Sequence, residues 1–468
     1  MSEIGFEAAS FRDRQGRVWL AEGAVYRCLN AQAAADWDVL KNKSFFKEGV
    51  REGAIVKTEE VAPENIRGGV PSGDWTKVLE HEKIPFISYP YEWSFGMLKD
   101  AGLLQLDLQI QALSDGMTLK DASSFNVQWR GGRPVFIDTP SFERHTEGAP
   151  WAGYRQFCQM FLYPLFFQAY KNVPFHPWLR GAIDGITPEQ CSRLMSLRDM
   201  LRPGVFSHAY LQAKLQSRFS DTDKDVRGDL KSAGFNKDLI LTNLRGLKNV
   251  VSGLSWGEES SEWAAYGDSH SYTDEDHAAK KDFVRNAVAA KPRRLVWDVG
   301  CNRGDFSRIA AESAEYVIAM DADHLVVDRM YRSVVKDGIE KILPLVVNAA
   351  DASPSLGWNG RERGDLASRG RPDMTLCLAL IHHIVISNHV PLPEFVRWLA
   401  GLGGGVVVEF VSREDPMVKK LLRNKKDIYD DYSEENLEAC LKKAFKIEKR
   451  LSLASGTRTL YHAEPLAQ

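Results

Sequence analysis

The feature that most constrains this 468-residue sequence is the stretch 293–323, which reads RRLVWDVGCNRGDFSRIAAESAEYVIAMDAD. It begins with a short, mostly apolar run at 295–299, followed by a turn bracketed by Gly300 and Gly304. Apolar residues then recur at helical spacing, and a second apolar run ends on Asp321. This order predicts a strand, turn, helix and strand of a parallel sheet. Asp321 would lie at the carboxyl end of the second strand, where open α/β sheets bind ligands.

The residues of the turn favour one of two nucleotide-type ligands, a dinucleotide or S-adenosylmethionine. A dinucleotide fingerprint needs Gly where this chain has Asn302 and Asp305. Asp298 and Asp305 flank the loop, and two carboxylates would repel a pyrophosphate. They suit a cationic ligand without phosphate, such as S-adenosylmethionine. Asp321 follows Gly300 by twenty-one residues (321 − 300), about where an acid binds ribose hydroxyls. A plain βα turn with two solvated acids is the alternative.

The motif at 298–304, DVGCNRG, resembles motif I of class I S-adenosylmethionine-dependent methyltransferases, with Asn302 in place of the usual middle Gly. The resemblance implies an α/β fold with a Rossmann-like, seven-stranded sheet that ends in an antiparallel pair. It also implies S-adenosylmethionine as cofactor and a small-molecule methyl acceptor. The cofactor-binding residues that it implies are Asp298, Gly300, Asn302, Gly304, Asp321, Ala322, Asp351 and Leu378.

Asp351 follows an expected third strand at 342–347. Its position resembles the place where these enzymes contact adenine, and an acid there can accept a hydrogen bond from the adenine amino group. The alternative is a plain turn at 351–354, which contains a Pro.

Candidates for acid–base chemistry lie at the ends of two later strands. The run 373–383 is expected to be the fourth strand and its exit, ending in His382 and His383. Neighbours on a strand point to opposite faces, so the two would not share a metal, and no metal site is expected. Either is a candidate general base, or else a buried His bonded to backbone. Glu409, near the end of the fifth strand, is a third candidate to face the acceptor.

The resemblance also bears on the acceptor atom. The run 373–383 lacks the Asp/Asn-Pro-Pro-aromatic signature of family members that methylate exocyclic or amide nitrogen. The expected acceptor atom is therefore oxygen or carbon.

The N-terminal half carries a second constellation, Asp121, Asn126 and Asp138, around a hairpin signal at Gly131-Gly132. Its spacing resembles the catalytic loop and metal-binding Asp of the protein-kinase and small-molecule-kinase fold. In that fold the first Asp orients the acceptor, while Asn and the last Asp hold magnesium. The preceding order also fits, with small strands, one helix at 31–47, more strands and a long helix at 93–113.

Four departures from the kinase pattern leave the role of this half open. Arg27 stands where the phosphate-binding Lys is expected, and no glycine-rich loop precedes it. Leu119 and Lys120 replace the His and Arg of H-R-D, and Asp138-Thr139-Pro140 replaces D-F-G. The N-terminal half is therefore a phosphotransferase or nucleotide-binding module, or else a non-catalytic domain that binds a substrate or partner. A hairpin with polar residues at its ends is the simplest alternative.

The expected organisation is an α+β N-terminal domain at 1–254, a polar linker at 255–273 and the methyltransferase domain at 274–468. A kinase-like N-terminal domain would have a small lobe at about 1–90 and a helical lobe at about 91–254. With motif I this late in the chain, the layout is similar to the NoeA group of bacterial methyltransferase-like proteins.

Composition excludes several classes of protein. Sixty Lys and Arg against 63 Asp and Glu leave a formal net charge of −3, so no global basic excess indicates nucleic acid. None of the six Cys forms a C-x-x-C pair, so we expect free thiols rather than a zinc site or disulfides. The N-terminus has no signal-peptide apolar region, and no apolar stretch is long enough to span a membrane. We therefore expect a cytoplasmic protein without a membrane partner.

Overall fold

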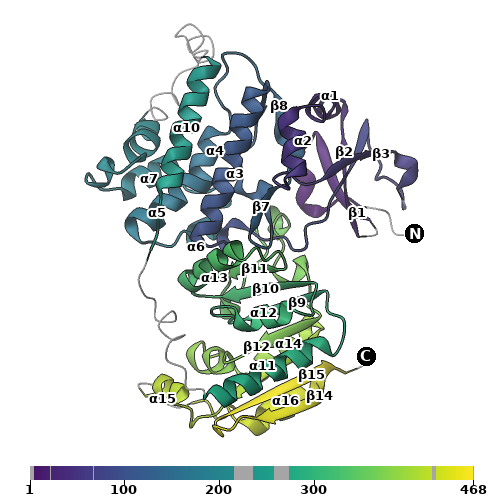
Figure 1. Cartoon of the computed structure of the whole chain (residues 1–468), viewed down its shortest axis with the longest axis vertical. Coiled ribbons are helices and arrows are strands. Elements are labelled where there is room, and N and C mark those ends of the chain that lie inside the picture. Colours follow the sequence, from purple (N-terminus) through teal and green to yellow (C-terminus); the bar gives the residue numbers. More distant parts are fainter. Residues whose placement is uncertain are drawn as a thin grey trace. The chain divides into compact units, whose positions relative to one another are not determined.

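The computed structural model describes residues 5–21, 23–66, 68–214, 236–257, 273–423 and 428–466. The chain divides into two compact units (Figure 1). The first comprises Met1–Trp129, Pro134–Gly257 and Ser355–Arg363, and the second comprises Arg130–Arg133, Glu258–Pro354 and Gly364–Gln468. Most of the linker expected at 255–273 lies outside the described residues.

The first unit begins with a four-stranded antiparallel sheet of order β1-β2-β4-β3. The strands are β1 (Gly16–Ala21), β2 (Ala24–Leu29), β3 (Thr58–Val61) and β4 (Lys77–His81). Two helices, α1 (Ala31–Leu40) and α2 (Ser44–Arg51), connect β2 to β3 where the sequence predicted one. The break has a tertiary cause, because Asp115 accepts a hydrogen bond of 3.0 Å from the Ser44 N–H and so caps α2 from a distant part of the chain.

The rest of the first unit is mainly helical. The long helix expected at 93–113 is α3 (Phe95–Ser114), with Ser94 as its N-cap, and α10 (Lys237–Gly253) packs against it (Figure 1). Two short antiparallel ladders follow α3, and the predicted hairpin is β6–β7. These strands are β5 (Met117–Leu119), β6 (Val127–Arg130), β7 (Arg133–Phe136) and β8 (Phe142–Arg144). Further helices among the described residues are α4 (Tyr154–Phe157), α5 (Tyr163–Lys171), α6 (His176–Gly181), α7 (Pro188–Leu194) and two π-helical turns (Cys158–Leu162 and Phe206–Tyr210).

The second unit is built on a seven-stranded mixed sheet of order β11-β10-β9-β12-β13-β15-β14. The first five strands in this order are parallel, and β15 pairs antiparallel with both β13 and β14. This confirms the predicted α/β fold with a terminal antiparallel pair. The strands are β9 (Leu295–Val299), β10 (Tyr316–Asp321), β11 (Ile342–Val346), β12 (Met374–Cys377), β13 (Gly405–Val411), β14 (Phe445–Ser452) and β15 (Arg458–Pro465).

Helices cover this sheet in two groups. Buried residues of α11, α12 and α13 share one hydrophobic cluster with the sheet, whereas α14 packs against α16. The helices are α11 (Asp274–Ala289), α12 (Asp305–Ala311), α13 (His324–Lys336), α14 (Leu392–Leu402), α15 (Pro416–Leu422) and α16 (Glu434–Ala444). Among the described residues, no helix combines the length and apolar character needed to cross a bilayer.

Candidate active site

The loop between β9 and α12, residues 300–304, is called the glycine loop below, and it makes a tight turn beside the end of β10. The N–H groups of Gly300 and Cys301 both donate to the Met320 carbonyl, at 2.8 and 2.9 Å. Gly300, Asn302 and Gly304 all have positive φ, at 78°, 48° and 83°. Asn tolerates this left-handed region better than other residues with a Cβ, which explains why it can stand in place of Gly.

Asp321 is tied to this loop. Its carboxylate accepts hydrogen bonds of 3.0 Å from the Asn302 N–H and from the Asp323 N–H. Burial raises the pKa of Asp321. The side chain is still partly exposed, and Ala322 beside it is exposed. The Ala322 N–H also donates to this carboxylate, which has the capacity to accept one further hydrogen bond on its exposed side.

The two acids that flank the loop lie in different environments. Asp298 is buried at the end of β9, where it accepts a hydrogen bond of 2.5 Å from the Ser307 hydroxyl. Burial raises the pKa of Asp298 to about 6, and Lys280 and the Ser307 bond oppose the shift. Asp305 is exposed on the first turn of α12. The hydrogen bond between Asp298 and Ser307 thus links β9 to α12, while Asp305 adds negative charge at the surface.

The remaining predicted cofactor residues follow neighbouring strands of the same sheet. Asp351 ends a short 3-10 turn after β11 and is exposed, whereas Leu378 is buried directly after β12. Because β11, β10, β9 and β12 are adjacent and parallel, the loops after all four strands lie at one edge of the sheet. The structure thus brings the predicted cofactor residues to a single edge.

The expectation for the two histidines was wrong in one respect. Strand β12 ends at Cys377, and His382 and His383 lie in the helical turn that follows, which continues as a π-helix over His383–Ser387. Their rings are therefore not on opposite faces of a strand, and the ring centroids lie 4.0 Å apart. Single π-helical turns are rare and are frequently found at functional sites.

The two rings differ in exposure. His382 is fully buried, and within the described residues neither of its ring nitrogens has a hydrogen-bond partner. Burial lowers the pKa of His382 well below its usual value, and His383, Arg458 and Lys280 act in the same direction. His383 is partly exposed, and burial together with Arg458 lowers its pKa to about 4. Both imidazoles are therefore neutral at pH 7.

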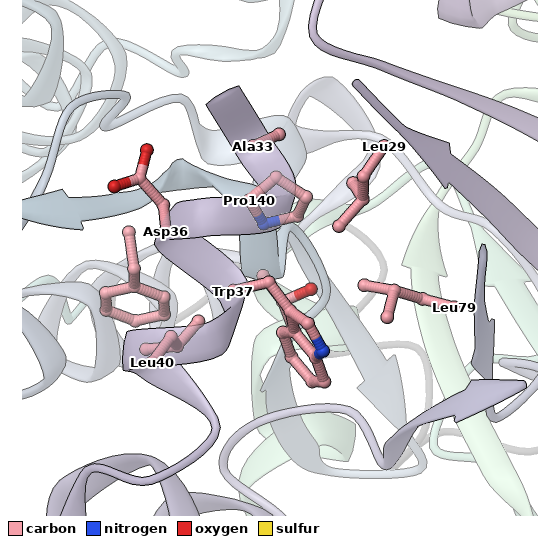
Figure 2. Close-up of a pocket in the computed structure, with 9 residues that line it drawn as sticks. Leu29, Ala33, Asp36, Trp37, Leu40, Leu79 and Pro140 are labelled. Atoms are coloured by element: carbon pink, nitrogen blue, oxygen red, sulfur yellow. The ribbon is translucent and has the colours of Figure 1, made fainter. Parts of the chain in front are cut away.

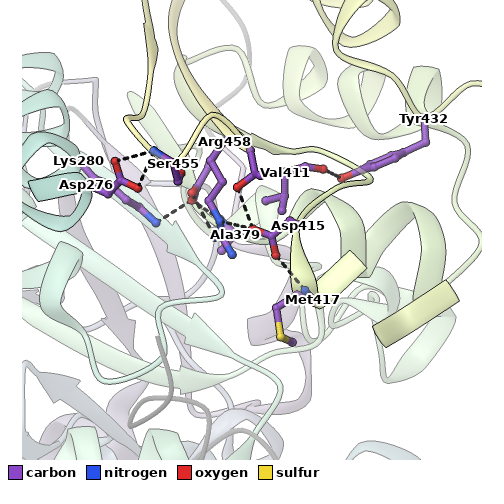
Figure 3. A network of polar contacts seen from close by, with 11 residues as sticks. Asp276, Lys280, Ala379, Val411, Asp415, Met417, Tyr432, Ser455 and Arg458 are labelled. Atoms are coloured by element: carbon purple, nitrogen blue, oxygen red, sulfur yellow. Dashed lines mark hydrogen bonds and ion pairs between the residues drawn. The ribbon is translucent and has the colours of Figure 1, made fainter. Parts of the chain in front are cut away.

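Glu409, the third acid–base candidate, is fully buried within β13. Its carboxylate accepts hydrogen bonds from the Lys280 ammonium at 2.6 Å and from the Ala379 N–H at 2.7 Å. Arg458 lies 3.3 Å from the other carboxylate oxygen, and Figure 3 shows Lys280, Ala379 and Arg458 gathered at this point. The three donors leave little of this carboxylate free for an acceptor.

Sequence reasoning did not find Lys280 or Arg458. A local signal for Lys280 existed, because it occupies the buried face of α11 together with Asp276 and Phe283. A charged residue on the buried face of a helix indicates a buried partner. No local signal identified that partner as Glu409, 129 residues later.

The N-terminal constellation also comes together in the structure. The guanidinium of Arg27 donates to Asp138 at 2.6 Å, and the Ser141 hydroxyl donates to the other oxygen of Asp138. Burial alone would raise the pKa of Asp138, but Arg27 and Ser141 lower it. Asp121 accepts from the Ser123 N–H at 2.9 Å. Burial and the nearby Asp138 raise the pKa of Asp121, and a hydrogen bond from Asn126 opposes this shift.

A mainly apolar pocket in the same unit lies next to this constellation, where α1 packs over the small sheet (Figure 2). One of its lining residues, Thr139, directly follows Asp138 in the sequence. Asp36 and Thr139 are its polar lining residues, and the others are Leu29, Ala33, Trp37, Leu40, Leu79, Pro140 and Phe142. This lining lacks the basic groups that a phosphate would need. Nor does any group of three or more His, Cys, Asp or Glu side chains in the described parts of the chain form a metal site.

Comparisons with known proteins place these features in context. No family model matches the chain. The nodulation protein NoeA of Rhizobium meliloti strain 1021 is 35% identical over 463 residues, which cover 98% of this chain and 96% of NoeA. The match therefore includes both units.

Solved structures that match part of the chain include two methyltransferases. The N-methyltransferase NodS of Bradyrhizobium japonicum WM9, in complex with S-adenosyl-L-homocysteine, is 8% identical with a TM-score of 0.32; the match covers 44% of this chain and 100% of NodS. The magnesium protoporphyrin IX methyltransferase ChlM of Synechocystis PCC 6803, with bound S-adenosylmethionine, is 16% identical with a TM-score of 0.29. That match covers 45% of this chain and 87% of ChlM.

Proposed function

The chain belongs to the family of the nodulation protein NoeA, and we propose that it transfers a methyl group from S-adenosylmethionine to an oxygen or carbon atom of a small-molecule acceptor. The observation that carries this proposal is the bond between the Asn302 N–H and the Asp321 carboxylate at the edge of a seven-stranded sheet. It joins a glycine loop flanked by carboxylates, which disfavour a phosphate, to a partly exposed acid that can accept from ribose hydroxyls.

The residues at the edge fit this cofactor. In this proposal Asp321 accepts from ribose hydroxyls and Asp351 accepts from the adenine amino group. A Cβ on Gly300 would lie 3.2 Å from the Leu380 side chain, so Gly lets the loop pack closely against the turn that follows β12. S-adenosylmethionine would supply the activated methyl group. The protein's part is to align the acceptor with that methyl and to exclude water.

For a hydroxyl acceptor, a proton must also be removed. We propose His383 for this step, because its imidazole is partly exposed and neutral at pH 7. In its neutral form an imidazole carries one unprotonated ring nitrogen, the group that takes up the proton in general-base catalysis. His382, fully buried behind it, would support the position of the His383 ring.

Calorimetric titration of the full chain with S-adenosyl-L-homocysteine tests the proposal. We expect a dissociation constant in the micromolar range and no binding of NAD, which has a pyrophosphate. Comparable affinity for NAD would contradict the proposal. The acceptor can be sought by comparing the metabolites of producing and deletion strains for a methyl-bearing compound that only the producing strain contains.

A second candidate function concerns the first unit. The structure brings Asp121, Asn126 and Asp138 together, as a nucleotide-binding, kinase-like domain would require. However, both oxygens of Asp138 already accept hydrogen bonds, from Arg27 and Ser141, where a kinase would coordinate magnesium. We therefore favour a non-catalytic binding domain over a phosphotransferase. Titration with ATP, with and without magnesium, separates the two, since a kinase-like site would bind ATP more tightly with the metal.

A further inference from the structure

Four charged side chains are buried together in the second unit (Figure 3). Lys280 of α11, Glu409 of β13, Arg458 of β15 and Asp415 before α15 are at most 3% exposed. Besides the contacts of Glu409, the Arg458 guanidinium donates to Asp415 at 2.8 Å, and Asp415 accepts from the Met417 N–H at 2.9 Å. Two cations and two anions thus form one neutral network that joins four separate elements.

Stability alone does not explain such a network. Removing four charges from water is costly, and well-packed apolar residues often serve as well or better in the same place. The arrangement is better explained by what it holds in a fixed position.

The backbone that it holds is the exit of β12. Ala379 donates its N–H to Glu409 and has φ of 51°, a left-handed conformation that residues with a Cβ rarely adopt. The next residue, Leu380, borders the glycine loop, because its side chain lies 3.2 Å from where a Cβ on Gly300 would be. The conformation at Ala379 therefore shapes one wall of the candidate cofactor site.

The network also reaches the other side of the loop. The Lys280 ammonium lies 4.8 Å from the centre of the Phe306 ring, at the start of α12, as well as 2.6 Å from Glu409. Lys280 thus contacts both the helix that follows the glycine loop and the acid that holds the β12 exit.

We propose that Glu409 is a positioning residue for the methyl-transfer site. Held between Lys280 and Arg458, its carboxylate fixes the Ala379 amide and with it the turn that borders the glycine loop. Glu409 then acts through Ala379 and does not itself touch the acceptor. The inference rests on the proposed function for its catalytic meaning, whereas the backbone contact can be tested without it.

The experiment measures amide hydrogen exchange at Ala379, together with the affinity for S-adenosyl-L-homocysteine, in full-length variants. Glu409→Leu removes the acceptor, so Ala379 should exchange about 10- to 100-fold faster, the factor that a lost bond to a charged group implies. Glu409→Gln retains an oxygen that can accept from Ala379 and should give a smaller increase. Ligand affinity should fall in the same order, by about tenfold for Glu409→Leu.

Asp276→Asn is the matched control. Asp276 is a buried acid on the same helix, one turn from Lys280, but its partners are the Ala454 and Ser455 amides in the β14–β15 turn. Its replacement should lower the melting temperature and leave Ala379 exchange and ligand affinity unchanged. Equal effects of Asp276→Asn and Glu409→Leu on Ala379 would overturn the proposal by showing a merely structural role.

Two further outcomes are informative. If Glu409→Leu does not fold, Lys280→Met tests the position of the carboxylate instead, because the Lys280 ammonium and the Ala379 N–H share the same carboxylate oxygen. Unchanged Ala379 exchange in that variant contradicts the proposal. If the wild-type protein binds no S-adenosyl-L-homocysteine but Ala379 exchange responds as expected, the proposed function fails and the positioning contact stands.

Discussion

The N–H of Asn302 donates a hydrogen bond of 3.0 Å to the carboxylate of Asp321. Asn302 follows β9, and Asp321 is the last residue of the adjacent parallel strand β10. One bond therefore sets the conformation of the glycine loop and the orientation of the acid at the same time. Substitution of either residue should therefore change the affinity for the ligand. The two substitutions differ in their expected effects on the stability of the protein.

Asp321→Ala should weaken binding of S-adenosyl-L-homocysteine by about 1.5–3 kcal/mol, the scale for hydrogen bonds to a charged group. Calorimetric titration measures the change. Glu312→Gln is a suitable control, since Glu312 is exposed at the end of α12 and pairs with Arg285. An unchanged dissociation constant in folded Asp321→Ala would show that this acid does not bind the ribose.

Replacement of Asn302 tests whether the loop needs a left-handed residue. Asn302→Gly should bind S-adenosyl-L-homocysteine about as well as the wild type, because Gly adopts positive φ without strain. Asn302→Val should destabilise the protein by about 1–2 kcal/mol, the cost of this conformation for a residue with a Cβ. Urea unfolding and calorimetry measure the two quantities. Equal stability of the Gly and Val variants would contradict the assignment of φ as the cause.

Local patterns were sufficient to predict the elements around this bond. Apolar runs predicted strands at 295–299 and 316–320, and the structure has β9 (Leu295–Val299) and β10 (Tyr316–Asp321). The Gly131-Gly132 signal likewise predicted the β6–β7 hairpin. In each case the residues that decide the structure are neighbours in the sequence.

What the sequence did not predict depends on contacts between distant residues. The apolar run towards His382 continues past Cys377, so periodicity alone does not show that β12 ends there. The start of α2 at Ser44 depends on a cap from Asp115, 71 residues later. The pairing of Lys280 with Glu409 is equally non-local, and it turns a candidate base into a buried, fully bonded acid.

His81 gives the first unit a pH-dependent stability. The side chain is 6% exposed, and burial, with a contribution from Arg27, lowers its pKa to about 3. The unfolded chain, with a His pKa of about 6.5, binds more protons than the folded chain between these values. Stability should therefore be fully present above pH 6.5 and fall, by at most about 1.4 kcal/mol per pH unit from this group, as the pH drops towards 3.

A His81→Leu variant checks this directly. Its melting temperature should fall less between pH 7 and pH 5 than that of the wild type, because the group that takes up the proton on unfolding is missing. Lys57→Gln, on the exposed side chain next to β3, serves as a surface control. Identical pH dependence in wild type and His81→Leu would exclude His81 as the source.

The last prediction separates the two histidines after β12. His383→Ala should lower turnover by about 10²–10⁴-fold, the usual contribution of a positioned base, and leave S-adenosyl-L-homocysteine binding nearly unchanged. Because the base must be unprotonated, kcat/KM should rise with pH through the pKa of His383, about 4, and be independent of this group near neutrality. His382→Ala should instead lower the melting temperature, since it leaves a cavity in a fully buried site. If both variants retain full turnover, the acceptor is one that needs no general base, such as a thiolate or an acidic carbon. If His382→Ala loses turnover without losing stability, the buried ring is the base and the assignment is reversed.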